Sequence, residues 1–189
     1  MKLAKTTVVV AAAITMTMVT NASASENSYR LRTDARFAPP TAFIPSRAVT
    51  YDMTLVPAAS YIEVKEYATN ALTRVVLKVR GLRPNRTYGA HVHTKPCDSR
   101  PDDSGPHYQN QPDPHQPSVD PVYANRRNEM WLDFKTDRSG KASAVSRNDW
   151  RFRLGGAGSV VIHERGTTTG PGEAGMAGAR VACFTVPLG

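Results

Sequence analysis

The sequence contains few cysteines and few aromatic residues. Its 189 residues include two Cys, and Phe, Trp and Tyr together make up 7% of the chain. No Cys-x-x-Cys pair is present, which excludes a structural zinc site built on such pairs. No His-Glu-x-x-His stretch is present either, which argues against a zinc protease. No segment keeps a helical period of apolar residues over three turns, so the pattern excludes a helical fold class.

Long apolar runs are also absent, except at the N-terminus. Lys2 and Lys5 precede an uncharged apolar and hydroxylic stretch over residues 6–19, and Ala22-Ser23-Ala24 follows it. This order is typical of a secretory signal peptide, so we expect residues 1–24 to be removed and the protein to be secreted or otherwise extracytoplasmic. A spanning helix would need about 20 apolar residues, and this run is shorter and rich in Thr. We therefore expect no stable membrane anchor.

Basic residues exceed acidic ones, and the formal net charge is +8. A positive surface favours nucleic acid, anionic lipids or a small anionic substrate. The basic residues are scattered along the sequence without an Arg/Lys tract or a nucleic-acid motif, so we expect no nucleic-acid partner. A small anionic substrate is compatible with this charge.

Short β-segments separated by turn residues dominate the rest of the chain. We expect a flexible N-terminal arm over residues 25–48 and one domain over residues 49–189. The regular spacing of the segments predicts an all-β fold, an antiparallel sandwich or barrel of about eight strands. The predicted strands are residues 49–56, 61–64, 72–79, 87–94, 130–134, 141–146, 149–154, 158–163 and 180–186. Two long loops, 95–128 and 166–178, interrupt them, and loops of such length are usually functional.

Cys97 and Cys183 are the only cysteines. An even number of cysteines in an exported chain favours one disulfide. The alternative is a pair of free buried thiols.

The five histidines suggest a metal site. His91 and His93 form a His-x-His pair, and residues i and i+2 of a strand point to the same face. The alternative is two hydrogen-bonded or exposed histidines. His107 and His115 lie in the first long loop, and His163 ends an apolar strand. Neutral imidazoles suit copper and zinc better than magnesium or calcium.

Several motifs occur in an order that resembles the copper/zinc superoxide dismutase family. They are Gly-Leu-Arg-Pro-Asn-Arg-Thr-Tyr-Gly-Ala-His-Val-His at 81–93, then Cys97, Gly-Pro-His at 105–107, Ser-Val-Val-Ile-His at 159–163 and Gly-Ala-Arg-Val-Ala-Cys at 178–183. The resemblance covers roughly residues 49–187 and implies a Greek-key β-barrel with two long functional loops.

The resemblance also implies a role for each motif residue. His91, His93 and His163 match the ligands that bind copper only, and His107 matches the histidine that bridges copper and zinc. Arg180 matches the arginine that guides the anion beside the copper, and Cys97 and Cys183 match the intrachain disulfide. In the family mechanism the position of His107 also delivers a proton, so we expect Arg180 and His107 to be the catalytic residues.

The sequence departs from the family at the zinc site. His115 matches the first ligand that binds zinc only, but Ala124 stands where the next histidine is expected. Glu129 is the nearest carboxylate for the zinc aspartate, with Asp133 as the fallback. A closed zinc site needs four protein ligands, so we expect zinc binding through His107, His115 and Glu129 to be weak or absent. Glu129 would then hydrogen-bond His107 in place of zinc.

Two functions follow from this pattern. The first is a superoxide dismutase that uses copper to convert superoxide into dioxygen and hydrogen peroxide outside the cytoplasm. The second is a copper-binding or copper-storage protein of the same fold without catalysis. Monomer and homodimer are both compatible with the sequence.

Overall fold

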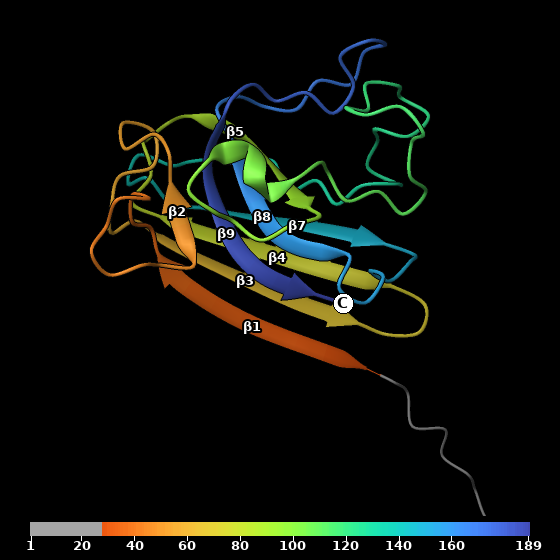
Figure 1. Cartoon of the computed structure of the whole chain (residues 1–189), viewed down its shortest axis with the longest axis horizontal. Helices are drawn as coiled ribbons and strands as arrows, with labels where there is room; N and C mark the ends of the chain where they lie inside the picture. Colours follow the sequence, from red (N-terminus) through yellow and green to blue (C-terminus); the bar gives the residue numbers. More distant parts are fainter. Residues whose placement is uncertain (1–27) are drawn as a thin grey trace, which may run out of the picture.

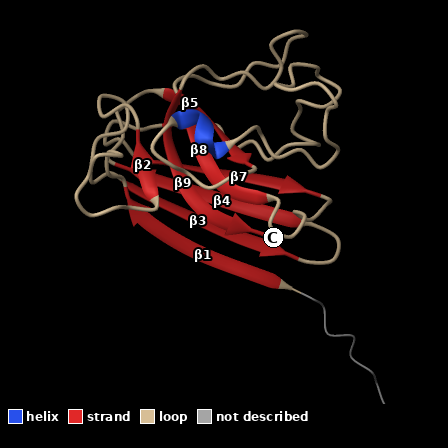
Figure 2. Ribbon diagram, in the orientation of Figure 1, coloured by secondary structure: helices blue, strands red, loops and turns tan. Residues whose placement is uncertain are grey.

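The computed structural model describes residues 28–189, which form two antiparallel β-sheets packed face to face (Figures 1 and 2). The four-stranded sheet has the order β1-β3-β4-β7, and the five-stranded sheet has the order β2-β9-β8-β5-β6. The strands are β1 (Tyr29–Arg36), β2 (Ala48–Thr50), β3 (Tyr61–Ala68), β4 (Thr73–Arg80), β5 (Thr87–His93), β6 (Phe134–Lys135), β7 (Ala142–Asn148), β8 (Ala157–His163) and β9 (Arg180–Leu188).

Alternation of side chains along each strand builds the core between the sheets. In β4, Val75, Leu77 and Val79 are buried in the core, and the residues between them point outward. In β5, Ala90 and Val92 belong to the same core. Because successive side chains of a strand alternate between faces, His91 and His93 point to the outer side of the five-stranded sheet.

The two long loops lie together at one end of the sandwich (Figure 1). The first follows β5 and carries the 3₁₀ turn η1 (Pro101–Ser104), and the second joins β8 to β9. Cys97 of the first loop is bonded to Cys183 of β9, which confirms the predicted disulfide. The bridge closes a separation of 86 residues and fixes the first loop against the five-stranded sheet.

The structure confirms the all-β class and the antiparallel sandwich, with two sheets that do not close into a barrel. The flexible arm predicted over residues 25–48 is wrong for its described part, residues 28–48, because β1 pairs with β3 along its whole length and β2 pairs with β9. The strand predicted at 149–154 is also absent, since this segment runs as irregular chain with Phe152 packed into the core. The predicted signal peptide, residues 1–24, lies outside the described residues.

No helix within residues 28–189 is long and apolar enough to cross a membrane.

Candidate metal centre

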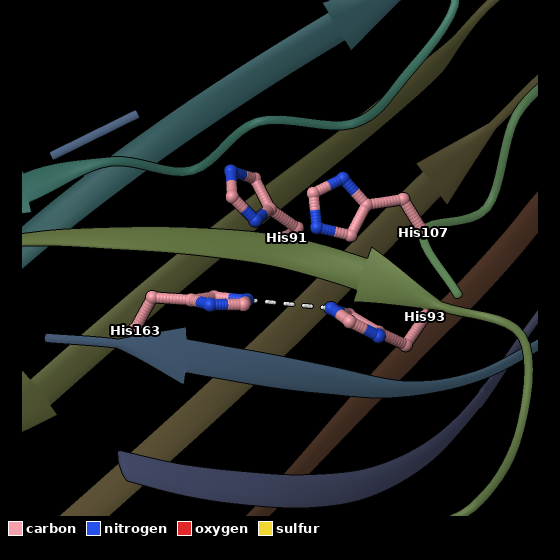
Figure 3. A group of neighbouring side chains, drawn as sticks. All are labelled: His91, His93, His107 and His163. Atoms are coloured by element: carbon pink, nitrogen blue, oxygen red, sulfur yellow. Dashed lines mark hydrogen bonds between the residues drawn. The ribbon is translucent and has the colours of Figure 1, made fainter. Parts of the chain in front are cut away.

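Three of the four clustered histidines come from two neighbouring strands. β5 and β8 pair antiparallel, with His91 opposite Val161 and His93 opposite Ser159. His163 ends β8 opposite Gly89, where the strand runs into the second long loop. The register of one strand pair therefore places these three imidazoles on the outer side of the sheet (Figure 3).

The fourth histidine, His107, comes from the first long loop. An isolated β-bridge pairs it with His93, and the backbone N–H of Tyr108 donates to the carbonyl of Val92 at 2.8 Å. Gly105 makes this return possible, because its φ of +73° disfavours other residues and a Cβ there would lie 2.5 Å from Thr94 Oγ1. The Gly-Pro-His motif thus folds the loop back over the pair on β5.

Each imidazole is held by one ring nitrogen. Nδ1–H of His93 donates to the carbonyl of Gly105 at 2.8 Å, and Nδ1–H of His163 donates to the carbonyl of Gly178 at 3.2 Å. Nδ1–H of His107 donates to Glu129 Oε2 at 2.8 Å. These acceptors leave the Nε2 lone pair of each ring free to bind a cation, since an acceptor at one nitrogen fixes the tautomer.

His91 is oriented through Nε2, whereas the other three rings are oriented through Nδ1. Its Nε2–H donates to Thr167 Oγ1 at 2.7 Å, and the Thr167 hydroxyl donates in turn to Asp133 Oδ1 at 2.8 Å. The Thr167 backbone N–H also donates to Asp133 Oδ2 at 3.0 Å. His91 Nδ1 is left buried and without a hydrogen-bond partner. A buried nitrogen without a partner is costly, and a bound cation would satisfy it.

The free nitrogens converge on one point. One ligand atom from each histidine lies within 4.8 Å of the others, and Nε2 of His93 is 3.4 Å from Nε2 of His163 (Figure 3). Two facing lone pairs at this distance repel unless a proton or a cation lies between them. The donor set therefore fits a metal ion that prefers imidazole, such as copper or zinc.

Burial keeps the strand histidines neutral. It lowers the pKa of His91 and of His93 well below the usual value, and the positive charge that His107 would carry adds to this effect. Burial, together with His107, lowers the pKa of His163 to about 3. Because only a neutral imidazole has a lone pair to offer, these rings are ready to bind a metal at neutral pH.

Glu129 occupies the position behind His107. Its side chain is buried, and its two oxygens accept three hydrogen bonds. Oε2 accepts from His107 Nδ1–H and from Trp131 Nε1–H at 2.6 Å, while Oε1 accepts from Gln109 Nε2–H at 2.8 Å. His107 Nδ1 thus faces a buried carboxylate that is itself held by two further hydrogen bonds.

His115 does not join the cluster. Its side chain is 94% exposed, and its Nδ1 lies 3.8 Å from Asp113 Oδ1. The structure therefore does not bring His107, His115 and Glu129 together as the three ligands of one ion. Asp113 accepts the backbone N–H of His115 in a local turn, and the His115 side chain lies in solvent.

A cavity of about 310 Å³ lies at one side of the histidine cluster. His107, His163 and Arg180 line it, together with Glu129 and residues of the second long loop such as Met176. The Arg180 guanidinium donates to Ser104 Oγ at 2.9 Å and to the carbonyl of Pro101 at 3.2 Å. Arg180 begins β9, three residues before Cys183, so the disulfide and η1 together fix its position.

The sequence does not predict the two residues that orient His91. The sequence pattern offers Asp133 only as a fallback zinc ligand and gives no role to Thr167. In the structure, Thr167 accepts from His91 and donates to Asp133. Thr167 is one of three consecutive threonines in a Gly/Thr-rich loop and belongs to no motif, so its contact with a strand residue 76 positions away could not be found from spacing.

The comparisons with known proteins concern the family and the fold. The family model described as copper/zinc superoxide dismutase matches residues 59–186. Among solved structures, Cu/Zn superoxide dismutase from Brucella abortus is 18% identical with a TM-score of 0.52, covering 82% of this chain and 99% of that chain. A single mutant of a SOD-like protein from Bacillus subtilis is also 18% identical with a TM-score of 0.53, covering 76% and 99%. The double mutant of that protein is 20% identical with a TM-score of 0.50, covering 70% and 90%.

These structures support the fold, and no curated protein matches the chain by sequence. The family match covers more than half of the chain and includes all four clustered histidines and Arg180. The chain belongs to the copper/zinc superoxide dismutase family.

Proposed function

We propose that the protein is a copper-dependent superoxide dismutase. One observation carries the proposal: four imidazole nitrogens lie within 4.8 Å of one another, and two of these histidines, His107 and His163, line a cavity together with Arg180. In the net reaction two superoxide anions and two protons give dioxygen and hydrogen peroxide, so the site must accept a small anion and supply protons. Bound copper would supply the one-electron redox chemistry, which zinc lacks.

The chain's own residues provide the rest of the chemistry. His91, through Nδ1, and His93, His107 and His163, through Nε2, would hold the metal. Arg180 supplies a permanent positive charge beside them, which favours docking of an anion and raises its encounter rate. The ring of His107 is 18% exposed, whereas His91 is fully buried. His107 Nε2 is therefore the ligand atom best placed to hold or release a proton toward the cavity.

We further propose that the site works without zinc. Support comes from Glu129, whose carboxylate accepts the Nδ1–H of His107, and from His115, whose side chain is exposed and outside the cluster. A carboxylate that orients a ligating histidine raises the basicity of that ligand and fixes its tautomer. Glu129 would thereby perform the orienting role of a bridged zinc ion.

Export is part of the proposal as well. The N-terminal pattern of residues 1–24 and a disulfide that closes 86 residues both suit an oxidising compartment. N-terminal sequencing of the secreted protein tests this, and a mature chain that begins at Met1 would contradict it.

Pulse radiolysis of superoxide with copper-loaded, zinc-free protein tests the enzymatic function. Without a catalyst, the decay of superoxide is second-order in superoxide. With the protein we expect a decay that is first-order in superoxide, with a rate constant that is proportional to the protein concentration and falls as salt is added. Full copper occupancy with no acceleration would contradict catalysis and favour the alternative, a copper-binding or copper-storage protein of the same fold.

A further inference from the structure

The outer face of the four-stranded sheet carries most of the net positive charge of residues 28–189. Alternate residues of β1, β3, β4 and β7 point away from the core, and we call them the basic face. They are Arg30, Arg32, Asp34, Arg36, Tyr61, Glu63, Lys65, Tyr67, Arg74, Val76, Lys78, Arg80, Ser143, Val145 and Arg147.

Scattered basic residues gather here because a strand places every second residue on one face. The basic face holds eight Lys or Arg and two Asp or Glu, a net charge of +6. Residues 28–189 hold 22 Lys or Arg and 15 Asp or Glu, a net charge of +7. Everything outside the basic face is therefore close to neutral by the same count. This face belongs to the sheet opposite the histidine cluster.

Two rows across the sheet repeat an Arg-Tyr-Arg arrangement. The register places Tyr67 between Arg30 and Arg74, whose guanidinium carbons lie 5.9 and 5.5 Å from the ring centroid. It places Tyr61 between Arg36 and Arg80, and the Arg80 guanidinium lies 5.5 Å from that ring. Contact with a ring holds these guanidinium groups in place, so they lose less side-chain entropy when an anion binds.

Most of these cations lack an acidic partner. Glu63 accepts Arg32 at 2.7 Å and Lys65 at 3.4 Å. Within residues 28–189, the other six basic residues of the face form no ion pair. A face that is rich in unpaired Arg fits the geometry of phosphate, which accepts two parallel N–H bonds from one guanidinium.

The arrangement favours a polymer over other partners. The two rows are six residues apart along β3, about 20 Å, so no single small anion can contact both. A second copy of this face would repel the first, because both are positive. Insertion into a bilayer needs exposed aromatic or large aliphatic side chains. The aliphatic residues of this face are Val76, which is buried, and Val145, and Arg groups lie over its two aromatic rings, Tyr61 and Tyr67.

We propose that the basic face binds a linear phosphodiester polymer through its phosphates. Since Arg groups lie over the rings of Tyr61 and Tyr67, the rings are not open for base stacking of the kind that single-strand binding proteins use. Binding should therefore depend on the charged backbone and not on bases. It would hold the protein on such a polymer with the histidine cluster on the opposite sheet.

Fluorescence anisotropy of the purified chain with a labelled single-stranded thymidine oligonucleotide tests the proposal. The test variant removes three exposed arginines from the basic face, and the control variant removes three exposed arginines elsewhere for the same change in net charge. The test variant is Arg30→Ser, Arg80→Ser and Arg147→Ser, and the control is Arg127→Ser, Arg138→Ser and Arg165→Ser.

We expect the test variant to bind at least about tenfold more weakly than the control, since three phosphate contacts are lost. The slope of log K against log salt should fall in magnitude by about 2, at roughly 0.7 for each phosphate contact. An abasic phosphodiester chain of equal length should compete as well as the oligonucleotide.

Equal losses in the two variants would overturn the assignment to this face. Failure of the abasic chain to compete would overturn backbone recognition in favour of bases. Binding to anionic phosphatidylglycerol vesicles without binding to either polymer would overturn the polymer in favour of a membrane surface. Urea unfolding of both variants is the control for folding, and the copper content of the test variant is a second control.

Discussion

Replacing Glu129 with Gln tests the arrangement behind His107 most sharply. The carboxylate is buried, with 1% of the residue exposed, and accepts from His107, Trp131 and Gln109. An amide nitrogen cannot accept a hydrogen bond, so at least one of these three donors would face another donor. In the less costly orientation the amide nitrogen takes the place of Oε1 and faces Gln109, and the remaining oxygen is uncharged.

The expected magnitude follows from these contacts. A hydrogen bond to a charged group contributes about 1.5–3 kcal/mol, so losing one and weakening two should lower the free energy of unfolding by about 2–3 kcal/mol. The hold on His107 Nδ1–H also weakens, which permits the tautomer with its proton on Nε2. Loss of such an orienting partner typically lowers metal affinity or activity by about 10–100-fold.

Competitive copper titration and urea unfolding of the metal-free protein measure the two effects. Glu173→Gln is the matched control, because Glu173 is exposed on the second long loop and the substitution changes the charge by the same amount. If copper affinity and unfolding of Glu129→Gln equal those of Glu173→Gln, the account of how His107 is held is wrong.

Four further predictions concern other parts of the molecule. Arg180→Ala should slow superoxide turnover by about tenfold or more and blunt its salt dependence with copper still bound, and unchanged turnover in pulse radiolysis would refute its role. Thr167→Val should weaken copper binding, because His91 Nε2–H loses its acceptor at a cost of about 1–3 kcal/mol. Thr167→Ser keeps the hydroxyl and should keep the copper affinity. Equal affinities of the two variants in a copper titration would refute the contact. Burial raises the pKa of Glu66, so the contribution of this carboxyl to stability is full below its unfolded pKa and is lost as the pH rises through its folded pKa. In urea unfolding, Glu66→Gln should therefore stabilise the protein at pH 7 and not at pH 4. Stabilisation at pH 4 and not at pH 7 would contradict this sign. Replacing Cys97 and Cys183 with Ser should lower the free energy of unfolding by about 2–5 kcal/mol in the same assay, since the bridge closes 86 residues, and an unchanged midpoint would contradict it.

Three of the four clustered histidines carry local signals in the sequence. His91 and His93 have the period of a strand, and His163 ends an apolar segment that forms β8. His107 required the resemblance to a family, since nothing in the loop itself places it against β5. The fold supplies what spacing cannot, namely the register of β5 with β8 and the bridge from His93 to His107.

The failures have physical causes too. β1 was missed because its inward residues include Thr33 and Ala35, which give a weak apolar alternation at the edge of a sheet. The contact of Asp133 with Thr167 joins residues 34 apart through a loop without periodicity. The basic face was missed because its charges belong to four strands and are adjacent only across the sheet.

The most direct test of the central claim is a metal count combined with superoxide turnover on protein refolded with copper and zinc together. We expect one tightly bound copper per chain, no stoichiometric zinc, and turnover that follows copper occupancy. Tight stoichiometric zinc, with turnover that appears only when zinc is bound, would contradict it.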